Sequence, residues 1–201
     1  MRFALLASAF LFAAPAFSPT FAEEPLHFPK KLDRTDFQQI ISDVGPIYIA
    51  GQPTADAMRS MAAEGVTTVI NLRTQQEMDN RKQVPYDEAA LVKELGMTYI
   101  HIPLGGPDTP YSPAAVEQVA AAIKAAGDKP ILLHCTVAWR ASHMWAAYLM
   151  KHRGVSRDEA IAQAKAINLG GAYGGVFPLD QFLGEASGAA PASMTPRPVA
   201  N

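Results

Sequence analysis

The strongest constraint on this chain is a short apolar run that ends at its only cysteine. Ile131-Leu132-Leu133-His134 leads directly into Cys135, and four residues separate this cysteine from Arg140. Such a run is typical of a strand buried on both faces of a parallel sheet. A helical pattern begins at Arg140 and continues to His152. The order of strand, short loop and helix therefore brings a thiol and a guanidinium together at a helix N-terminus.

That junction is a natural place for an anion. Backbone N–H groups converge at a helix N-terminus, and the helix dipole favours negative charge there. Arg140 adds a planar fork of donors that suits phosphate or sulfate oxygens. We therefore expect an oxyanion or a phosphorylated substrate to be held by Arg140 and by the loop residues Thr136, Val137, Ala138 and Trp139.

Cys135 has two interpretations, an inert buried thiol or a nucleophile. The chain contains one cysteine, so an internal disulfide is excluded. An unperturbed thiol, with a pKa of about 8.5, is only a few per cent ionised at neutral pH. A helix N-terminus and a nearby cation lower the pKa of reactive cysteines by several units. The neighbours of Cys135 therefore favour a reactive thiolate.

Strand and helix patterns alternate along the chain, which indicates an α/β fold. Strand patterns cover residues 47–50, 66–72, 97–104 and 131–134, and helical patterns cover 55–64, 87–95, 113–126, 140–152, 157–167 and 176–183. Residues 36–41 fit either a short strand or a turn of helix. Alternation of this kind produces right-handed βαβ units. We expect a mostly parallel central sheet of four to five strands flanked by helices.

The loops at Arg73, Asp108 and Cys135 each follow the end of a predicted strand. Ligands bind outside the carboxyl ends of the strands in such sheets, so these loops should meet at one rim. We expect Arg73 to contribute to substrate binding there. A cysteinyl-phosphate mechanism also needs a proton donor for the leaving group and then a base for water. Asp108 is the best candidate, although it also fits a turn residue after Pro107; the weaker candidates are Glu77, Asp79 and Asp87.

The expected roles of other side chains near the loop are less specific. Strand alternation turns His134 away from the loop, where it should be a buried hydrogen-bonding residue that shapes the loop. Trp139 either flanks a substrate ring or forms part of the core, and Ser142 either donates to the thiolate or lies in the first helical turn. Trp145, Tyr148 and Leu149 have the spacing of core residues. The five histidines are scattered, so no metal site and no cofactor are predicted.

The first residues have the layout of a secretory signal peptide. Met1-Arg2 supplies a positive charge, an apolar run follows, and small residues occur near Ala16 and Ala22. The run is short for a membrane span, and an N-terminal core helix is the alternative. We expect a signal peptide at 1–22, an α/β domain at 23–185 and a disordered tail at 186–201. Cleavage after Ala22, or after Ala16, would release a soluble secreted protein, periplasmic in a Gram-negative host, with no stable membrane insertion.

Composition narrows the possible partners. The formal net charge is −2, which argues against a nucleic-acid partner. Apolar residues make up 49% of the chain and charged residues 18%, as in a soluble globular protein.

Three segments resemble the cysteine-dependent protein tyrosine and dual-specificity phosphatases. His134-Cys135, the short loop and Arg140 look like the signature of that superfamily. Residues 65–73 resemble the Gly-strand-Asn-Leu-Arg segment of the dual-specificity branch, and residues 47–54 are similar to the start of bacterial phosphatase domains related to the β-lactamase-hydrolase-like family. The resemblance covers Ile47 to Arg153. It implies a parallel-sheet phosphatase fold with Cys135 as nucleophile, Arg140 as phosphate clamp and Asp108 as general acid.

The chain departs from the usual phosphatase signature in its loop. Four residues replace the usual five between Cys and Arg, Ala138 replaces a common glycine, and Ala141 follows the arginine where Ser or Thr is usual. A shorter loop narrows the space for an anion between Cys135 and Arg140. The sequence therefore fits three functions: an exported phosphatase with a cysteinyl-phosphate intermediate, a rhodanese-type sulfurtransferase, and a non-catalytic phosphate-binding module.

Overall fold

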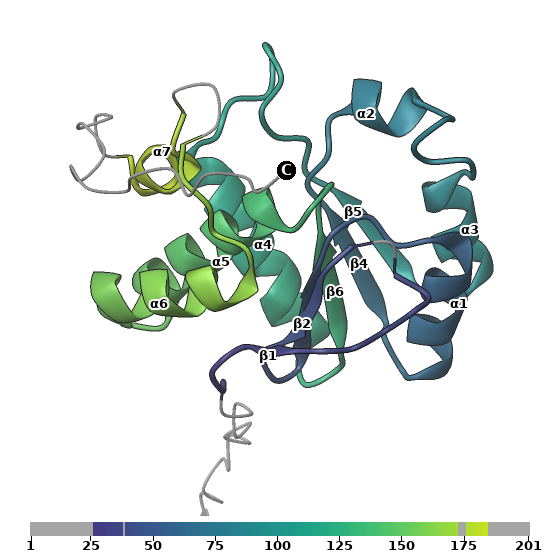
Figure 1. Cartoon of the computed structure of the whole chain (residues 1–201), viewed down its shortest axis with the longest axis horizontal. Coiled ribbons are helices and arrows are strands. Elements are labelled where there is room, and N and C mark those ends of the chain that lie inside the picture. The colour runs from purple at the N-terminus through teal and green to yellow at the C-terminus, as the bar shows by residue number, and fades with distance from the viewer. Residues whose placement is uncertain (1–25, 38, 173–175, 185–201) are drawn as a thin grey trace, which may run out of the picture.

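The computed structural model describes residues 26–37, 39–172 and 176–184. Within them, a six-stranded sheet lies between two layers of helices (Figure 1). The expected signal peptide at 1–22 and the expected tail at 186–201 lie outside the described residues, as do the two expected domain boundaries.

Four parallel strands form the centre of the sheet. They are β3 (Ile47–Ala50), β6 (Ile131–His134), β4 (Thr68–Asn71) and β5 (Thr98–His101), side by side in that order. Two antiparallel strands, β1 (Lys30–Lys31) and β2 (Ile41–Asp43), extend the sheet beyond β3. The predicted α/β fold is confirmed, with six strands in the sheet where four to five were expected. β1 and β2 are two and three residues long, too short to produce a readable alternation.

The helices divide between the two faces of the sheet. α4 (Pro113–Ala126), α5 (Trp139–His152), α6 (Arg157–Ile167) and α7 (Pro178–Leu183) lie on one side, and α1 (Ala55–Ala63) and α3 (Glu88–Glu94) lie on the other (Figure 1). α2 (Gln75–Asp79) lies beyond the carboxyl ends of the strands (Figure 1). The predicted core residues Trp145, Tyr148 and Leu149 are buried on α5. α2 was not predicted, because its five residues carry no apolar period.

Alternation along β6 assigns its side chains to opposite faces. Ile131 and Leu133 belong to the core under α4 and α5, and Cys135 continues on that side. Leu132 belongs to the core under α1 and α3. His134, two residues on from Leu132, therefore points away from Cys135 and toward α3, as the sequence predicted.

The N-terminus of α5 lacks a side-chain cap. Five other helices begin with a side chain that accepts from their own backbone: Thr54, Thr74, Asp87, Ser112 and Ser156. The N-cap of α5 is Ala138, which offers no such acceptor. Because the first amides of a helix have no intrahelical partner, α5 presents donors suited to another acceptor.

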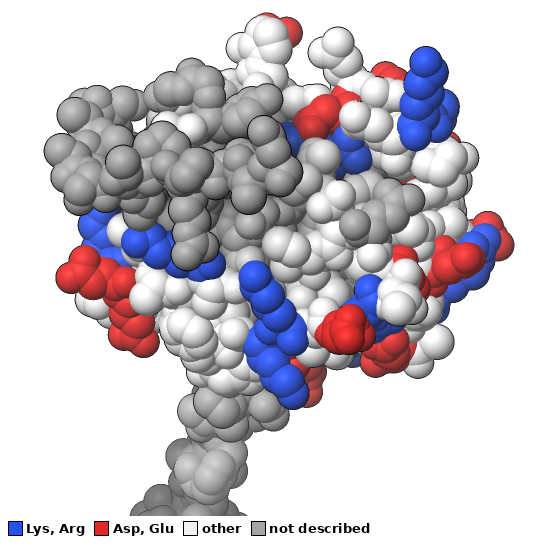
Figure 2. All heavy atoms as spheres, viewed as in Figure 1, with Lys and Arg blue, Asp and Glu red and all other residues white. Residues whose placement is uncertain are grey.

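Acidic and basic side chains are interspersed in small groups over the face shown in Figure 2. No helix of the described residues has the length and apolar content needed to cross a membrane. The same residues contain no group of three or more His, Cys, Asp or Glu side chains placed to hold a metal ion.

Candidate active site

Three hydrogen bonds anchor the loop between Cys135 and α5. The Cys135 amide donates to the carbonyl oxygen of Ala50 at 3.2 Å, and the Gln52 amide donates to that of Thr136 at 2.9 Å. The side chain of Asn168 donates to the carbonyl oxygen of Val137 at 2.6 Å. These contacts hold two consecutive loop carbonyls against the protein, so the loop has a fixed shape before any ligand arrives.

Ala138 turns the chain into α5 through a left-handed conformation. Its φ of 64° makes it the only described non-glycine residue with a positive φ. This conformation costs an L-residue about 1–2 kcal/mol, and such strain is concentrated at functional sites. A glycine is common here in the resembling phosphatases, and the geometry explains that preference. The chain keeps the turn with alanine, whose methyl group is fully buried.

Arg140 is locked in place through both terminal nitrogens of its guanidinium. One nitrogen, Nη1, donates to the carbonyl oxygens of Leu72 and Leu104 at 3.1 and 2.8 Å and to Glu77 Oε2 at 2.8 Å. The other, Nη2, donates to Glu77 Oε1 at 2.5 Å and to Thr136 Oγ1 at 3.0 Å. The side chain is 10% exposed, so the site has one fixed orientation of this cation.

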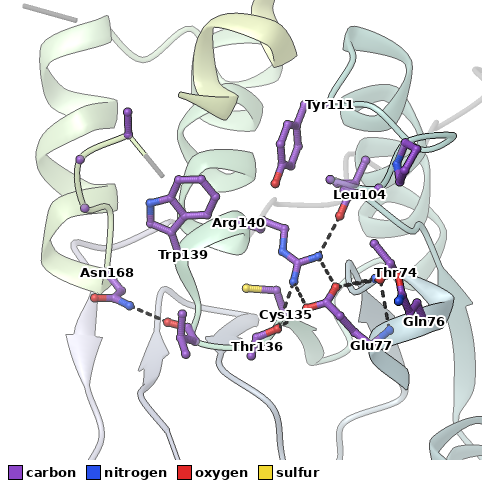
Figure 3. A pocket seen from close by; sticks show the side chains of 17 residues that line it. Thr74, Gln76, Glu77, Leu104, Tyr111, Cys135, Thr136, Trp139, Arg140 and Asn168 are labelled. Carbon is purple, nitrogen blue, oxygen red and sulfur yellow. Dashed lines mark hydrogen bonds and ion pairs between the residues drawn. The ribbon is translucent and has the colours of Figure 1, made fainter. Parts of the chain in front are cut away.

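The remaining edge of the guanidinium faces the nucleophile. Nε of Arg140 has no hydrogen-bond partner among the residues that the structure describes. Figure 3 shows this edge on the side of the Cys135 sulfur, with Glu77 on the far side. The sequence predicted a fork that holds the phosphate through its two ends. In the structure both ends are instead bonded to protein atoms, Glu77 among them, and Nε is the group left for an oxyanion.

Glu77 is held by α2 and by the nucleophile loop together. It forms a capping box with Thr74, and Thr136 Oγ1 donates to its Oε1 at 2.8 Å. Burial acts to raise the pKa of this carboxyl, but the hydrogen bonds and charge of Arg140 outweigh burial and lower the pKa to about 2. Glu77 is therefore ionised at neutral pH and is unsuited to be the proton donor.

Asp79 and Asp87, the other two alternatives to Asp108 as general acid, lie away from the site. Asp79 is exposed at the end of α2, where it accepts from Gln75. Asp87 is the N-cap of α3 and accepts from the Ala90 amide. Neither lines the cavity described next.

A cavity of about 730 Å³ opens over the nucleophile loop. Trp139 and Tyr111 form aromatic walls, and Arg140 and Glu77 are the charged residues on the lining (Figure 3). The complete lining is Thr74, Gln76, Glu77, Leu104, Gly105, Gly106, Pro107, Tyr111, Cys135, Thr136, Val137, Trp139, Arg140, Asn168, Gly170, Gly171 and Ala172. Of the predicted loop residues, only Ala138 is absent from this lining.

Asp108 lies at the tip of the loop beside the cavity. The loop closes on itself through Gly105 and Thr109, whose backbone atoms are bonded at 2.8 Å, and Asp108 is exposed. Its neighbour Pro107 lines the cavity, whereas Asp108 does not. The loop is thus at the predicted rim, with Asp108 at its exposed tip and outside the cavity lining.

Arg73 and Ser142 do not contact the cavity. Arg73 is 1% exposed and donates to Gln52 and Gln83, while its Nε lies 3.7 Å from Glu77 Oε1. It therefore lies behind Glu77 and outside the cavity lining, and the predicted contribution of Arg73 to substrate binding stays a prediction. Ser142 donates to the Trp139 carbonyl oxygen at 2.8 Å, so it completes the first turn of α5 and does not serve the thiolate.

Sequence reasoning missed the role of Glu77 and the presence of Tyr111 and Asn168 in the site. Thr74 and Glu77 have the spacing of a capping box, which was a usable signal for α2. Tyr111 and Asn168 follow Gly-rich or helical segments and carry no comparable signal. The ring of Tyr111 is fixed by an edge contact with Phe182, with centroids 5.4 Å apart.

Known proteins share this fold. Residues 34–173 match the family model described as "DSP-PTPase phosphatase fused to NAD+ Kinase". A beta-lactamase hydrolase-like protein of Xylella fastidiosa is 30% identical over 126 residues, which are 62% of this chain and 28% of that protein. The chain thus spans well under half the length of this relative.

Solved phosphatases superimpose on the chain. Kinase associated phosphatase, with its catalytic cysteine replaced by serine, has a TM-score of 0.54 and 16% identity over 72% of this chain and 85% of its own. A cysteine-to-serine form of TpbA from P. aeruginosa in complex with pTyr has a TM-score of 0.53 and 17% identity, over 69% and 77% of the two chains. A DUF442 phosphatase from Shewanella putrefaciens CN-32 has a TM-score of 0.51 and 24% identity, over 79% and 89%. These likenesses establish the fold, and the family match covers most of the chain. The chain belongs to the DSP-PTPase family of cysteine-dependent phosphatases.

Proposed function

We propose that this chain hydrolyses phosphomonoesters through a cysteinyl-phosphate intermediate. The observation that carries the proposal is the fixed guanidinium of Arg140, whose Nε edge faces Cys135 at the uncapped N-terminus of α5. Membership of a phosphatase family favours this reaction over sulfur transfer.

In the first step, the Cys135 thiolate attacks phosphorus in line with the leaving oxygen. The S–P bond forms as the P–O bond to the leaving group breaks, and a proton from Asp108 neutralises that oxygen. Arg140 Nε and the first amides of α5 hold the non-bridging oxygens, where charge builds up in the transition state. Asp108 is assigned this role because the Asp108 loop forms one side of the cavity, whereas Glu77 is ionised and cannot donate a proton.

In the second step, water attacks the phosphorus of the intermediate. The Asp108 carboxylate accepts a proton from that water, the P–S bond breaks, and inorganic phosphate leaves with the thiolate restored. No oxidant or cofactor is needed for this balance.

The lining favours a phosphate carried on an apolar or aromatic group. Trp139 and Tyr111 offer aromatic surface beside the loop, and Arg140 is the cation on the lining. Its charge is matched by Glu77, so the site supplies little attraction for several phosphates on one molecule. We propose phosphotyrosine-like monoesters over nucleotides and polyphosphates. Equal kcat/KM for phosphotyrosine and for a nucleoside triphosphate would contradict this preference.

The central test is release of phosphate from p-nitrophenyl phosphate. Cys135→Ser should abolish turnover, because an alcohol near neutral pH lacks the nucleophilicity of a thiolate. Ser142→Ala is the matched control, since Ser142 bonds only within α5 among the described contacts and lies outside the cavity lining. Equal rates for wild type and Cys135→Ser would refute the proposal.

We also propose that the protein is exported. The proposal is supported by the positive charge at Arg2, the apolar run that follows it and the small residues near Ala22. Cell fractionation should recover the full-length gene product outside the cytoplasm and a version lacking residues 2–22 inside it. The same location for both would contradict export.

A further inference from the structure

The hydroxyl of Tyr111 is a polar group on the cavity lining that the reaction described above does not use. Figure 3 shows the Tyr111 side chain over the nucleophile loop, with its hydroxyl directed toward Arg140. This hydroxyl has no hydrogen-bond partner among the residues that the structure describes. The charges of Arg140, Cys135 and Glu77 all act on it, which places the phenol close to the groups that meet the phosphate.

Packing around the start of α4 fixes the position of this phenol. Tyr111 directly precedes Ser112, the N-cap of α4, and Pro113 fixes φ at the first helical position. The ring makes its edge contact with Phe182 at an interplanar angle of 83°. A Cβ on Gly105 would lie 2.5 Å from the hydroxyl oxygen, so a side chain at residue 105 would displace the phenol. The hydroxyl is therefore held in place before a ligand arrives.

Most other polar side chains on the lining are already bonded to protein atoms. Four of them have such bonds: Thr74, Glu77, Thr136 and Asn168. Gln76 is exposed to solvent. Among the hydroxyl, amide and guanidinium groups of the described lining, the Tyr111 hydroxyl and Arg140 Nε are the sheltered donors left for a ligand. A sheltered donor without a partner is unfavourable, and a phosphate oxygen would satisfy it.

Tyr111 remains a neutral donor under the conditions in which a phosphatase acts. Burial has the largest effect on the pKa of its hydroxyl and raises it above the usual value for a phenol, about 10. A neutral phenol adds no negative charge to a site that receives an anion. Hydrogen bonds to an ionised acceptor are roughly twice as strong as those between neutral groups. The contact with a phosphate oxygen would therefore be a strong one.

The donors assigned to the phosphoryl group so far all come from one part of the cavity. Arg140 Nε and the first amides of α5 belong to the junction that follows Cys135. Tyr111 belongs to a different wall, at the start of α4 (Figure 3). The oxygens of a tetrahedral phosphoryl group point in several directions, so donors on two walls hold the group better than donors on one.

We propose that Tyr111 is a catalytic residue whose hydroxyl donates a hydrogen bond to a non-bridging oxygen of the phosphoryl group. Together with Arg140 Nε, it holds that group from two walls in both chemical steps. The phenolic O–H bond stays intact throughout, and Asp108 keeps its place as the proton donor. The inference rests on the proposed function and deepens it by naming a further group of the same site.

The first test is the binding of tungstate to wild type and Tyr111→Phe, measured by titration calorimetry. Tungstate is a tetrahedral oxyanion without a leaving group, so its binding requires no turnover. Phenylalanine keeps the ring and its contact with Phe182 and removes only the hydroxyl. The dissociation constant should rise about tenfold, as expected for the loss of one hydrogen bond to a charged group. An unchanged constant overturns the proposal.

Thermal unfolding of the same variant separates a ligand contact from a structural one. Because the hydroxyl has no partner in the described structure, Tyr111→Phe should melt at the wild-type temperature or slightly above it. A clearly lower melting temperature would show that the hydroxyl is already bonded within the protein, and it would overturn the proposal.

Tyr148→Phe is the matched control. Tyr148 lies on α5, where it stacks on Trp145 and His152, and it is outside the cavity lining. This variant also loses one phenolic hydroxyl, but its tungstate affinity and its turnover should match wild type. An equal loss in both variants would mean that the effect is not specific to the cavity, which overturns the proposal.

The second test compares p-nitrophenyl phosphate with phenyl phosphate, whose leaving group is much more basic. Tyr111→Phe should lower kcat/KM about tenfold for both substrates, because a bond to a non-bridging oxygen does not depend on the leaving oxygen. A loss that grows with leaving-group pKa would place the hydroxyl on the leaving oxygen and overturn the proposal. If wild type binds tungstate more tightly than Tyr111→Phe but releases no phosphate, the proposed function fails and the contact of Tyr111 with the oxyanion stands.

Discussion

Replacing Glu77 by Gln tests whether the active site is built on an ion pair. Glutamine has nearly the same shape and can still accept from the Thr74 amide, so the capping box of α2 is largely kept. What is lost is the charge opposite Arg140, a side chain with 10% exposure. An uncompensated buried cation destabilises the fold and loosens the group that must face the phosphate.

The size of the effect follows from the carboxyl's pKa. Its fall from 4.5 to about 2 corresponds to about 3 kcal/mol at about 1.4 kcal/mol per unit. The Glu77 side chain is 30% exposed, so solvent screening reduces this to about 2 kcal/mol. Because the folded-state pKa is the lower one, the stabilisation is complete above about pH 4.5 and is lost as the pH falls toward 2.

Urea unfolding of wild type and Glu77→Gln at neutral pH and near pH 3 measures this difference. The variant should be less stable by about 2 kcal/mol at neutral pH, and the gap should narrow in acid. Glu117→Gln is the control, because Glu117 pairs with Lys151 at the surface and its loss should have a much smaller effect. A gap absent at neutral pH, or unchanged in acid, would refute the reasoning.

Three further substitutions probe the reaction and its cavity. Arg140→Lys should lower kcat/KM for p-nitrophenyl phosphate by at least about 100-fold, because a point charge cannot bond Glu77 and the oxyanion from two edges; activity within a few fold of wild type would remove Arg140 from the site. Asp108→Asn should lose rate most for poor leaving groups, and a loss independent of leaving-group pKa would exclude the acid role. Gly105→Ala should raise KM for aryl phosphates, because residue 105 has a φ of 89° and a Cβ there would lie 2.5 Å from the Tyr111 hydroxyl; an unchanged KM would show that this wall does not contact substrate.

The parallel core and the junction at Cys135 were predictable because they depend on local pattern. The buried run at β6 and the helix after it are specified by apolar spacing, and alternation correctly turned His134 away from Cys135. The other strands of the parallel core, β3, β4 and β5, were predictable from the same kind of local pattern. β1 and β2 were not predictable in this way, because each depends on a neighbouring strand, β2 for β1 and β3 for β2, and not on its own composition.

The charge arrangement of the site was harder to predict. Glu77 lies 63 residues before Arg140, and only folding brings the two together. Sequence reasoning gave Arg140 entirely to the substrate, whereas the structure divides its donors between Glu77 and the cavity. His134 Nε2 lies 3.0 Å from Glu88 Oε1, a residue 46 positions away in the sequence, and this contact was equally beyond reach of spacing alone.

A crystal structure with vanadate bound would show the proposed transition-state contacts at atomic detail. Vanadium should be bonded to the Cys135 sulfur, with oxygens on Arg140 Nε and on the first amides of α5, and with the Arg140–Glu77 pair intact. Vanadate bound away from the sulfur, or an Arg140 side chain that leaves Glu77 and turns out of the cavity, would contradict the proposed mechanism.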